Sequence, residues 1–230
     1  AQVLSSRGCP YKCIFCVWPA VMTGEDPTGD KNRQVRQYSK DYMEALLDEW
    51  VFKYNYNSVY FDDDTFNLGD KHTLEMCEVM RKINIPWSAM CRADTIKKDT
   101  WKVMKESGCV GVKIGFESGN QFVIDNIVNK ALDLEKARET VSHLSDLGMD
   151  IHGTFTYGLP GETLDQMQDT KNYIKTLKLT SFQESGTAEL EGTPLSNLRD
   201  AGELKTYKGA KIDSNFIVEK DGQKKFLKLT

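Results

Sequence analysis

Cys9, Cys13 and Cys16 lie in one short segment near the start of the chain. Thiolates spaced four and three residues apart can bind one polynuclear metal centre from a single loop. A [4Fe–4S] cluster has four irons and usually takes four cysteine ligands. Three cysteines leave one iron open to an external ligand, so the spacing predicts an iron–sulfur centre that catalyses a reaction.

The other cysteines and the histidines offer no obvious fourth ligand. These residues are Cys77, Cys91, Cys109, His72, His143 and His152. A zinc site usually takes a second pair of ligands that is well separated from the first, and disulfide frameworks are typical of small secreted domains. We expect the three remaining cysteines to be small buried apolar residues. Zinc binding and disulfides are the alternatives to the cluster.

Charged residues follow three of the predicted strands. Asp62, Asp63 and Asp64 place three like charges at one strand end, which predicts a cation nearby. A solvated turn or a helix cap is the alternative. Arg92 and Glu117 are both predicted to point inward, where a buried charge needs a partner. They could pair with each other or hold a charged ligand.

Lys113 is unusual because its strand places it on the inward face. A lysine there needs an anionic partner, either a substrate or an acid such as Glu117. A shift of one residue in register would turn it outward. Residues that could line a substrate cavity, with ordinary packing as the alternative, are Tyr60, His152, Thr154, Tyr157 and Gln183.

Short apolar runs alternate along the sequence with longer amphipathic ones, and these runs predict the strands and helices that position the residues above. Strands are predicted at Gln2–Ser6, Ser58–Asp62, Trp87–Arg92, Val110–Glu117, Asp150–Tyr157 and Thr180–Ser185. Helices are predicted at Lys40–Tyr54, Lys71–Ile83, Thr100–Ser107, Gln121–Val128, Leu134–Leu147 and Thr163–Leu177. Ser39, Asp99 and Asp133 are the predicted N-caps. This alternation predicts right-handed βαβ units and a parallel sheet.

The strand Val110–Glu117 favours a barrel over an open sheet. One face carries Val and Ile side chains with Phe116, and the other carries two glycines, Lys113 and Glu117. The apolar face suits an outer layer of helices, and the small and charged face suits a barrel interior that holds a polar ligand. Near the end of the chain, Asp221-Gly222 is a hairpin signal between Phe216–Glu219 and Lys225–Leu229.

Composition and charge narrow the function classes. The 230 residues suffice for one large α/β domain, and 40% apolar and 28% charged residues are ordinary for a soluble protein. The net charge of −4 gives no basic excess for nucleic acid. No apolar run approaches the roughly 20 residues that span a bilayer, no secretory signal is visible, and a cytoplasmic location is expected. Because the chain lacks an initiator Met, we expect a piece of a longer protein.

The CxxxCxxC loop, with Phe15 directly before the last cysteine, resembles the signature of radical S-adenosylmethionine (SAM) enzymes. Further motifs in the same order are Phe61-Asp62-Asp63-Asp64-Thr65-Phe66, Trp87 through Asp94, Gly115-Phe116-Glu117-Ser118-Gly119, Gly158-Leu159-Pro160-Gly161-Glu162 and Gly192-Thr193-Pro194-Leu195. The set covers about residues 3–196 and resembles the branch that contains cobalamin-dependent methylases.

The resemblance implies a fold and a set of cofactors. The expected fold class is α/β, a partial (β/α)6 TIM-like barrel with parallel strands over residues 1–196 and a short C-terminal hairpin extension over residues 197–230. In this family the open iron is chelated by the amino and carboxylate groups of SAM. The expected cofactors are a [4Fe–4S] cluster and SAM, with cobalamin bound by a domain outside this chain.

The resemblance also implies roles for residues. It places Cys9, Cys13 and Cys16 on the cluster, and Phe15 beside the adenine. The Asp62 to Asp64 strand end meets the methionine amino group, and the glycines of the 158–162 turn permit a close approach to adenine. Glu162 can instead serve the N-terminus of the next helix. The candidate cofactor-binding residues are Phe15, Asp62, Asp63, Asp64, Arg92, Glu117, Ser118, Gly158, Pro160 and Gly161.

The function implied by the resemblance is reductive cleavage of SAM to a 5′-deoxyadenosyl radical, for cobalamin-associated methylation or rearrangement at an unactivated carbon. One alternative is a cobalamin-free radical SAM enzyme, similar to methylthiotransferases or coproporphyrinogen oxidase. Another is a non-enzymatic iron–sulfur or zinc protein. The expected partners are a small-molecule or lipid substrate and a reductant such as flavodoxin or ferredoxin.

Overall fold

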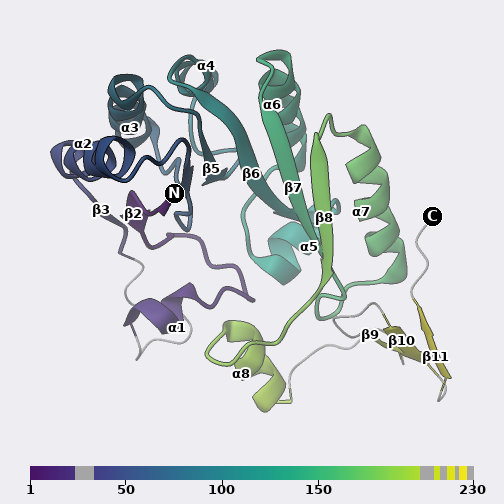
Figure 1. Cartoon of the computed structure of the whole chain (residues 1–230). Coiled ribbons are helices and arrows are strands. Elements are labelled where there is room, and N and C mark those ends of the chain that lie inside the picture. Colours follow the sequence, from purple (N-terminus) through teal and green to yellow (C-terminus); the bar gives the residue numbers. More distant parts are fainter. Residues whose placement is uncertain (24–33, 203–209, 213–216, 221–222, 227–230) are drawn as a thin grey trace.

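Six parallel strands form one curved sheet at the centre of the molecule (Figure 1). The computed structural model describes residues 1–23, 34–202, 210–212, 217–220 and 223–226. The strands, in spatial order, are β1 (Gln2–Val3), β4 (Val59–Phe61), β5 (Trp87–Cys91), β6 (Cys109–Glu117), β7 (Asp150–Tyr157) and β8 (Ser181–Gly186). Each pairs in parallel with the next. Within these residues β1 does not pair with β8, so the barrel is partial, as predicted.

Helices follow one another around the outside of this sheet (Figure 1). They are α2 (Lys40–Asp48), α3 (Asp70–Ile83), α4 (Lys98–Glu106), α6 (Leu134–Asp146) and α7 (Leu164–Thr176). Helix α2 continues into a π-helical turn, η1 (Glu49–Lys53), and α5 (Gln121–Val123) continues into η2 (Ile124–Val128). Among the helices that the structure describes, none has the length and apolar character of a membrane span.

The two faces of β6 differ as the sequence predicts from Val112 onward, but Val110, predicted on the apolar face, is 47% exposed. Val112, Ile114 and Phe116 are at most 4% exposed and belong to the core under the helices. Phe116 stacks on Phe155 of β7 at 5.3 Å and meets Tyr173 of α7 edge-on at 6.2 Å. The opposite, concave face of the sheet is therefore left to the intervening small and charged residues of β6.

Two of the predicted helix caps are confirmed, and one is wrong. Ser39 caps α2, and Asp133 Oδ1 accepts from two backbone N–H groups of α6. Asp99 is not a cap, because α4 begins one residue earlier, at Lys98. The N-cap is Lys97, which has no capping side chain, and Asp70 of α3 holds this end by accepting from the Lys97 N–H at 3.1 Å and the Thr100 hydroxyl at 2.7 Å.

Some elements differ from the predicted ones. The predicted first strand is split into β1 and β2 (Ser6–Arg7), and β2 pairs with β3 (Arg36–Gln37). Helices α1 (Trp18–Thr23) and α8 (Pro194–Asp200) were not predicted. The C-terminal hairpin forms from β10 (Ile217–Lys220) and β11 (Gln223–Phe226), with β9 (Ala210–Ile212) added antiparallel. Its predicted Asp221-Gly222 turn lies outside the described residues.

Candidate functional site

The cysteine loop begins with a tight turn at Gly8, held by Asp64 from the segment that follows β4. The Gly8 N–H donates to Asp64 Oδ2 at 2.6 Å. Gly8 has φ +94°, and a Cβ there would lie 2.3 Å from the backbone oxygen of Gln34. Only glycine combines this left-handed conformation with so close an approach. The turn therefore fixes where the three cysteines start.

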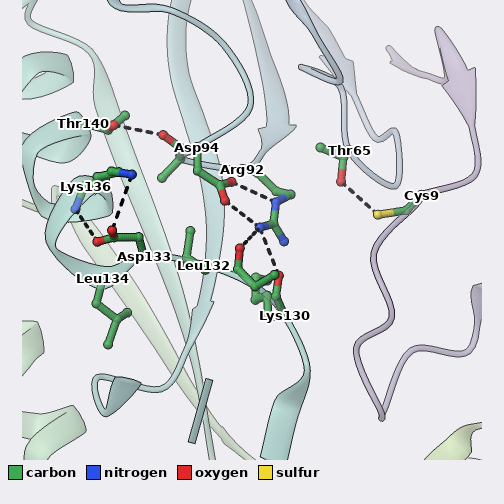
Figure 2. A network of polar contacts seen from close by, with 12 residues as sticks. Cys9, Thr65, Arg92, Asp94, Lys130, Leu132, Asp133, Leu134, Lys136 and Thr140 are labelled. Atoms are coloured by element: carbon green, nitrogen blue, oxygen red, sulfur yellow. Dashed lines mark hydrogen bonds and ion pairs between the residues drawn. The ribbon is translucent and has the colours of Figure 1, made fainter. Parts of the chain in front are cut away.

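The loop is then held by several separate elements. Cys9 Sγ lies 3.6 Å from Thr65 Oγ1 (Figure 2). The Ile14 N–H donates to the Val128 carbonyl at 3.0 Å, and the Ile14 carbonyl accepts from the Leu195 N–H at 2.9 Å. Segments from β4, η2 and α8 thus meet at one loop, although they are far apart in sequence.

The six cysteines fall into two groups. Cys9, Cys13 and Cys16 are partly exposed on the loop, and none of the six cysteines forms a disulfide in the described part of the chain. Cys77, Cys91 and Cys109 are at most 3% exposed and belong to the apolar core. Burial raises the pKa of the Cys77 thiol to about 11. The predicted division between loop and core cysteines is confirmed.

The donor set of the loop is three thiols, the ligand type of iron–sulfur clusters. Among the described residues, no three His, Cys, Asp or Glu side chains converge as ligands of one metal ion. Thiolates on a [4Fe–4S] cluster bind different irons, so they need not converge on a point. The residues present therefore suit three corners of such a cluster.

A buried ion pair lies next to the loop. Lys130 Nζ lies 2.9 Å from Glu117 Oε1, and the two side chains are 9% and 12% exposed. Glu117 Oε2 accepts from Thr156 Oγ1 at 3.1 Å. A Cβ on Gly115 would lie 2.5 Å from Glu117 Oε1, so glycine leaves room for the pair. Cys13 is near both charges: burial raises the pKa of its thiol, and Lys130 partly offsets the shift.

The backbone around this pair is strained. Glu117 has φ +67°, where a non-glycine residue is uncommon, and the register between β6 and β7 shifts between Gly115 and Glu117. Such irregularities at a strand end re-aim a side chain and cluster at functional sites. Asn129 and Ala131, on either side of Lys130, also have positive φ. The prediction that Glu117 faces inward, opposite Phe116, is confirmed.

Lys130 is the charged residue that the sequence did not reveal. Burial opposes its charge, but the Glu117 carboxylate and the Cys13 thiol outweigh this and raise the pKa of Lys130. The sequence signal is weak, since Lys130 follows η2 in an irregular segment with no periodic pattern. Only the fold brings it to the end of β6.

Arg92 does not pair with Glu117, which corrects one predicted arrangement. Figure 2 shows its guanidinium between the Asp94 carboxylate and the Lys130 backbone carbonyl. Both nitrogen–oxygen distances to Asp94 are within 2.9 Å. The guanidinium also lies over the ring of Tyr11 in the cysteine loop, 3.4 Å from its centroid. Arg92 therefore positions the loop and the Lys130 segment together.

The three aspartates after β4 have three environments. Asp63 is 1% exposed and accepts from the Ser5 and Ser6 hydroxyls at 2.8 and 2.6 Å. Asp62 is partly exposed and accepts from the Gln2 amide. Asp64 Oδ1 is buried without a hydrogen-bond partner in the described part of the chain, and burial raises the pKa of this carboxyl. The run is not a uniform cation site, because Asp63 fastens β2 to β4.

The turn after β7 meets the cysteine loop. Gly158 and Gly161 have φ +73° and +80°, as a tight turn requires. Between them Leu159 packs with Val123 and Val128, and Phe15 of the cysteine loop packs against the same group. The two segments expected beside adenine are thus brought together.

Two side chains near this turn are buried and hydrogen-bonded within the protein. Glu162 is fully buried and accepts from the Leu159 N–H at 3.1 Å, while Thr163 supplies the helix cap of α7. Burial raises the pKa of Glu162 to about 8. Ser118 directs its hydroxyl to Thr170 of α7 at 3.0 Å. Only the backbone of Ser118 is left to contact a ligand, because its side chain is engaged by the helix layer.

Most residues expected to line a substrate cavity lie on the concave face. Tyr60, His152 and Thr154 alternate with core residues of β4 and β7, and Gln183 of β8 is paired in register with Thr154. Tyr157 is an exception, because it faces the helix layer and donates to Glu184 at 2.6 Å. Its predicted position in a cavity is wrong.

The chain resembles known proteins in sequence and in fold. A family model described as the radical SAM superfamily matches residues 3–174. An uncharacterised methyltransferase of Pyrococcus horikoshii is 26% identical over 195 residues, which cover 84% of this chain and 40% of that protein. Cytidylyl-2-hydroxyethylphosphonate methyltransferase of Streptomyces wedmorensis is 27% identical over 205 residues, with 84% and 36% covered. The chain thus spans about two fifths of these curated relatives.

Solved structures share the fold at low sequence identity. TsrM from Kitasatospora setae, a radical SAM methyltransferase with cobalamin and a [4Fe–4S] cluster bound, has a TM-score of 0.70 and 17% identity, covering 92% of this chain and 39% of TsrM. OxsB, a cobalamin-dependent radical enzyme with aqua-cobalamin and SAM bound, has a TM-score of 0.68 and 19% identity, covering 88% and 35%. At these identities the likeness shows the fold alone.

Proposed function

We propose that this chain, which belongs to the radical SAM superfamily, holds a [4Fe–4S] cluster on Cys9, Cys13 and Cys16 and cleaves SAM reductively. The whole protein would use the resulting radical chemistry for cobalamin-associated methylation or rearrangement at an unactivated carbon. The observation that carries the proposal is the meeting of the cysteine loop with the buried Glu117–Lys130 pair, whose charges reach the Cys13 thiol. Bound together, the cluster and SAM supply a one-electron cleavage of the sulfonium to a 5′-deoxyadenosyl radical.

The buried pair suits a ligand that carries both charges. SAM has an amino group and a carboxylate on the same carbon. Lys130 would attract the carboxylate, and Glu117 would accept a hydrogen bond from the amino group or a ribose hydroxyl. Because the pair is already assembled and held by Thr156, little reorganisation is needed when the ligand enters.

The adenine end would contact a different surface. Phe15 and Leu159 lie on one apolar group beside the Gly158–Gly161 turn. An aromatic ring and aliphatic side chains suit a flat heterocycle, and the glycines let the backbone approach it. Pro160 lies in the same turn. The backbone of this turn would hold the base against the cysteine loop.

The sheet also needs a cover during the reaction. β1 and β8 are not paired within the described residues, so one side of the partial barrel stays open. A radical in an open site would be quenched by water and oxygen, which lids exclude in such enzymes. The cover would come from protein segments outside residues 1–230 or from the substrate itself.

Anaerobic reconstitution with iron and sulfide tests the assignment. The protein should gain a [4Fe–4S] Mössbauer signature, and SAM should change the parameters of one iron in four. Cys13→Ala is the matched control and should give neither effect. A cluster that does not respond to SAM would contradict the proposal, and a protein that takes up only zinc would support the non-enzymatic alternative.

A test of cobalamin-associated methylation needs a longer protein than these 230 residues. With the region upstream of residue 1 included, we expect cobalamin to bind and methyl transfer to a substrate to become measurable. A longer protein that binds SAM and a cluster but no cobalamin would favour the cobalamin-free alternative. The electron would come from a flavodoxin or ferredoxin, which a reductant screen would identify.

A further inference from the structure

A row of polar side chains crosses the concave face away from the cysteine loop. Lys113 of β6 is paired in register with His152 of β7, and His152 is paired with Ser181 of β8. On its other side, Lys113 is paired with Met90 of β5. Side chains in register on one face of a sheet are neighbours. The row therefore places a lysine, a histidine and a serine side by side.

Lys113 has no anionic partner in the part of the chain that the structure describes. It is partly buried between two core neighbours of β6, and no hydrogen bond or ion pair engages its ammonium group. The acid expected to pair with it, Glu117, is taken by Lys130, and Asp62 accepts from Gln2. Removing an ammonium group from water without a counter-charge is costly. Lys113 therefore lies partly buried on this face with no counter-charge in the described part of the chain.

His152 and Ser181 add directed hydrogen-bonding groups to the same row. His152 Nδ1 lies 2.8 Å from Ser181 Oγ. Burial lowers the pKa of His152, and the positive charge of Lys113 lowers it further. When Nδ1 accepts a hydrogen bond from the Ser181 hydroxyl, the neutral imidazole carries its hydrogen on Nε2. Among the described residues, no group accepts a hydrogen bond from this Nε2–H. A second donor is then available next to Lys113.

We propose that Lys113 and His152, whose imidazole is oriented by Ser181, bind an anionic oxygen group of the substrate, either a carboxylate or a phosphate-type group. This inference rests on the proposed function, since it names the substrate class of the same site. Lys113 and Glu117 are four residues apart on β6, which is roughly 13 Å in an extended strand. The small residues Gly115 and Thr154 lie between them. The substrate would enter with its anion on this row and its reacting carbon toward the Glu117 end.

Histidine NMR tests the row without relying on turnover. The chain has three histidines, so protein with labelled imidazole gives few signals, and His152→Gln assigns the one of interest. The probes are inorganic phosphate and sodium acetate at constant ionic strength. Unreduced SAM is present so that its own carboxylate site is filled. We expect a saturable shift of the His152 signal and none of His143, which lies on the outer helix α6.

Matched lysine variants decide whether Lys113 is responsible. Lys113→Gln should weaken the apparent anion affinity at least about tenfold, because a charge-assisted hydrogen bond is lost. Lys113→Arg should keep the response, as should Lys175→Gln, which removes an exposed charge from α7. A response to only one probe identifies the group as a carboxylate or as phosphate-type. An unchanged affinity in Lys113→Gln, or no response of His152 to either anion, would overturn the proposal.

Failure of this inference is separable from failure of the proposed function. Cluster content and 5′-deoxyadenosine formation are measured on the same preparation. An anion response without SAM cleavage would keep the anion site and reject the radical function. SAM cleavage without an anion response would keep the radical function and reject the anion site.

Discussion

Glu117 and Lys130 form a buried ion pair, with 2.9 Å between Oε1 and Nζ, at the strand end beside the cysteine loop. They come from different elements, since Glu117 ends β6 and Lys130 follows η2. Removing one partner of a buried pair leaves an uncompensated charge. The pair therefore links ligand binding to the stability of this end of the sheet.

Glu117→Gln should weaken SAM binding at least about tenfold, because the negative charge that faces the ligand is lost. The glutamine carbonyl can still accept from Lys130, so the protein should stay folded, with a stability loss of about 2 kcal/mol. Calorimetry on the reconstituted protein measures the affinity, and urea unfolding measures the stability. Glu139→Gln, at an exposed position of α6, is the control. Unchanged affinity in Glu117→Gln would refute the assignment.

Cys9→Ala, Cys13→Ala and Cys16→Ala should each abolish assembly of an intact cluster. Cys77→Ala, Cys91→Ala and Cys109→Ala should keep it, with a stability loss of about 1 kcal/mol each, because these thiols only fill space in the core. Iron analysis and Mössbauer spectra distinguish the groups. If any core cysteine were required for a full cluster, the hypothesis that one iron lacks a cysteine ligand would be wrong.

Gly8→Ala should lower cluster occupancy, because the added Cβ would meet the Gln34 backbone oxygen at 2.3 Å and displace the turn before Cys9. Gly69→Ala is a matched control. Gly69 has φ +92°, almost the same as Gly8, but a Cβ there would meet nothing within 4 Å. Both variants carry left-handed strain, so iron content should fall only in Gly8→Ala. Equal occupancy would show that the close approach is unimportant.

The sequence predicted the sheet and the charged residues of the site, but not which charges pair with each other. Alternation in β6 predicted that Ile114 faces the core and Lys113 the other side, because a slip of one residue would exchange them. The register shift before Glu117 was not predicted. The partners of the charges could not be predicted. Arg92 pairs with Asp94 and Glu117 with Lys130 because irregular loops, which carry no periodic signal, bring them together.

Some short helices and strands were not predicted, for a related reason. Helix α8 begins with the N-cap Thr193 and a proline at its first turn, a start signal that was present in the sequence. The helix has only seven residues, so its apolar pattern is too short to recognise. β2 and β3 are two residues each, and their pairing depends on Asp63 holding Ser5 and Ser6.

Glu162 should make the protein less stable as the pH rises. Burial raises its pKa to about 8 in the folded state, whereas an unfolded glutamate has a pKa of about 4.3. Between these values the folded protein holds the extra proton, so stability falls as the pH rises through the window, by about 5 kcal/mol in total. Urea unfolding of wild type and Glu162→Gln at pH 5 to 8 measures the difference. Parallel curves for the two proteins would mean that Glu162 is already charged.

The most direct measurement of the central claim is the formation of 5′-deoxyadenosine. The reconstituted protein is incubated without oxygen, with dithionite and SAM, and the products are separated by chromatography. Because the cysteine loop and the Glu117–Lys130 pair are both present in this chain, we expect 5′-deoxyadenosine from the wild type and none from Cys13→Ala. A protein that carries a full cluster and binds SAM yet yields no 5′-deoxyadenosine would contradict the radical assignment.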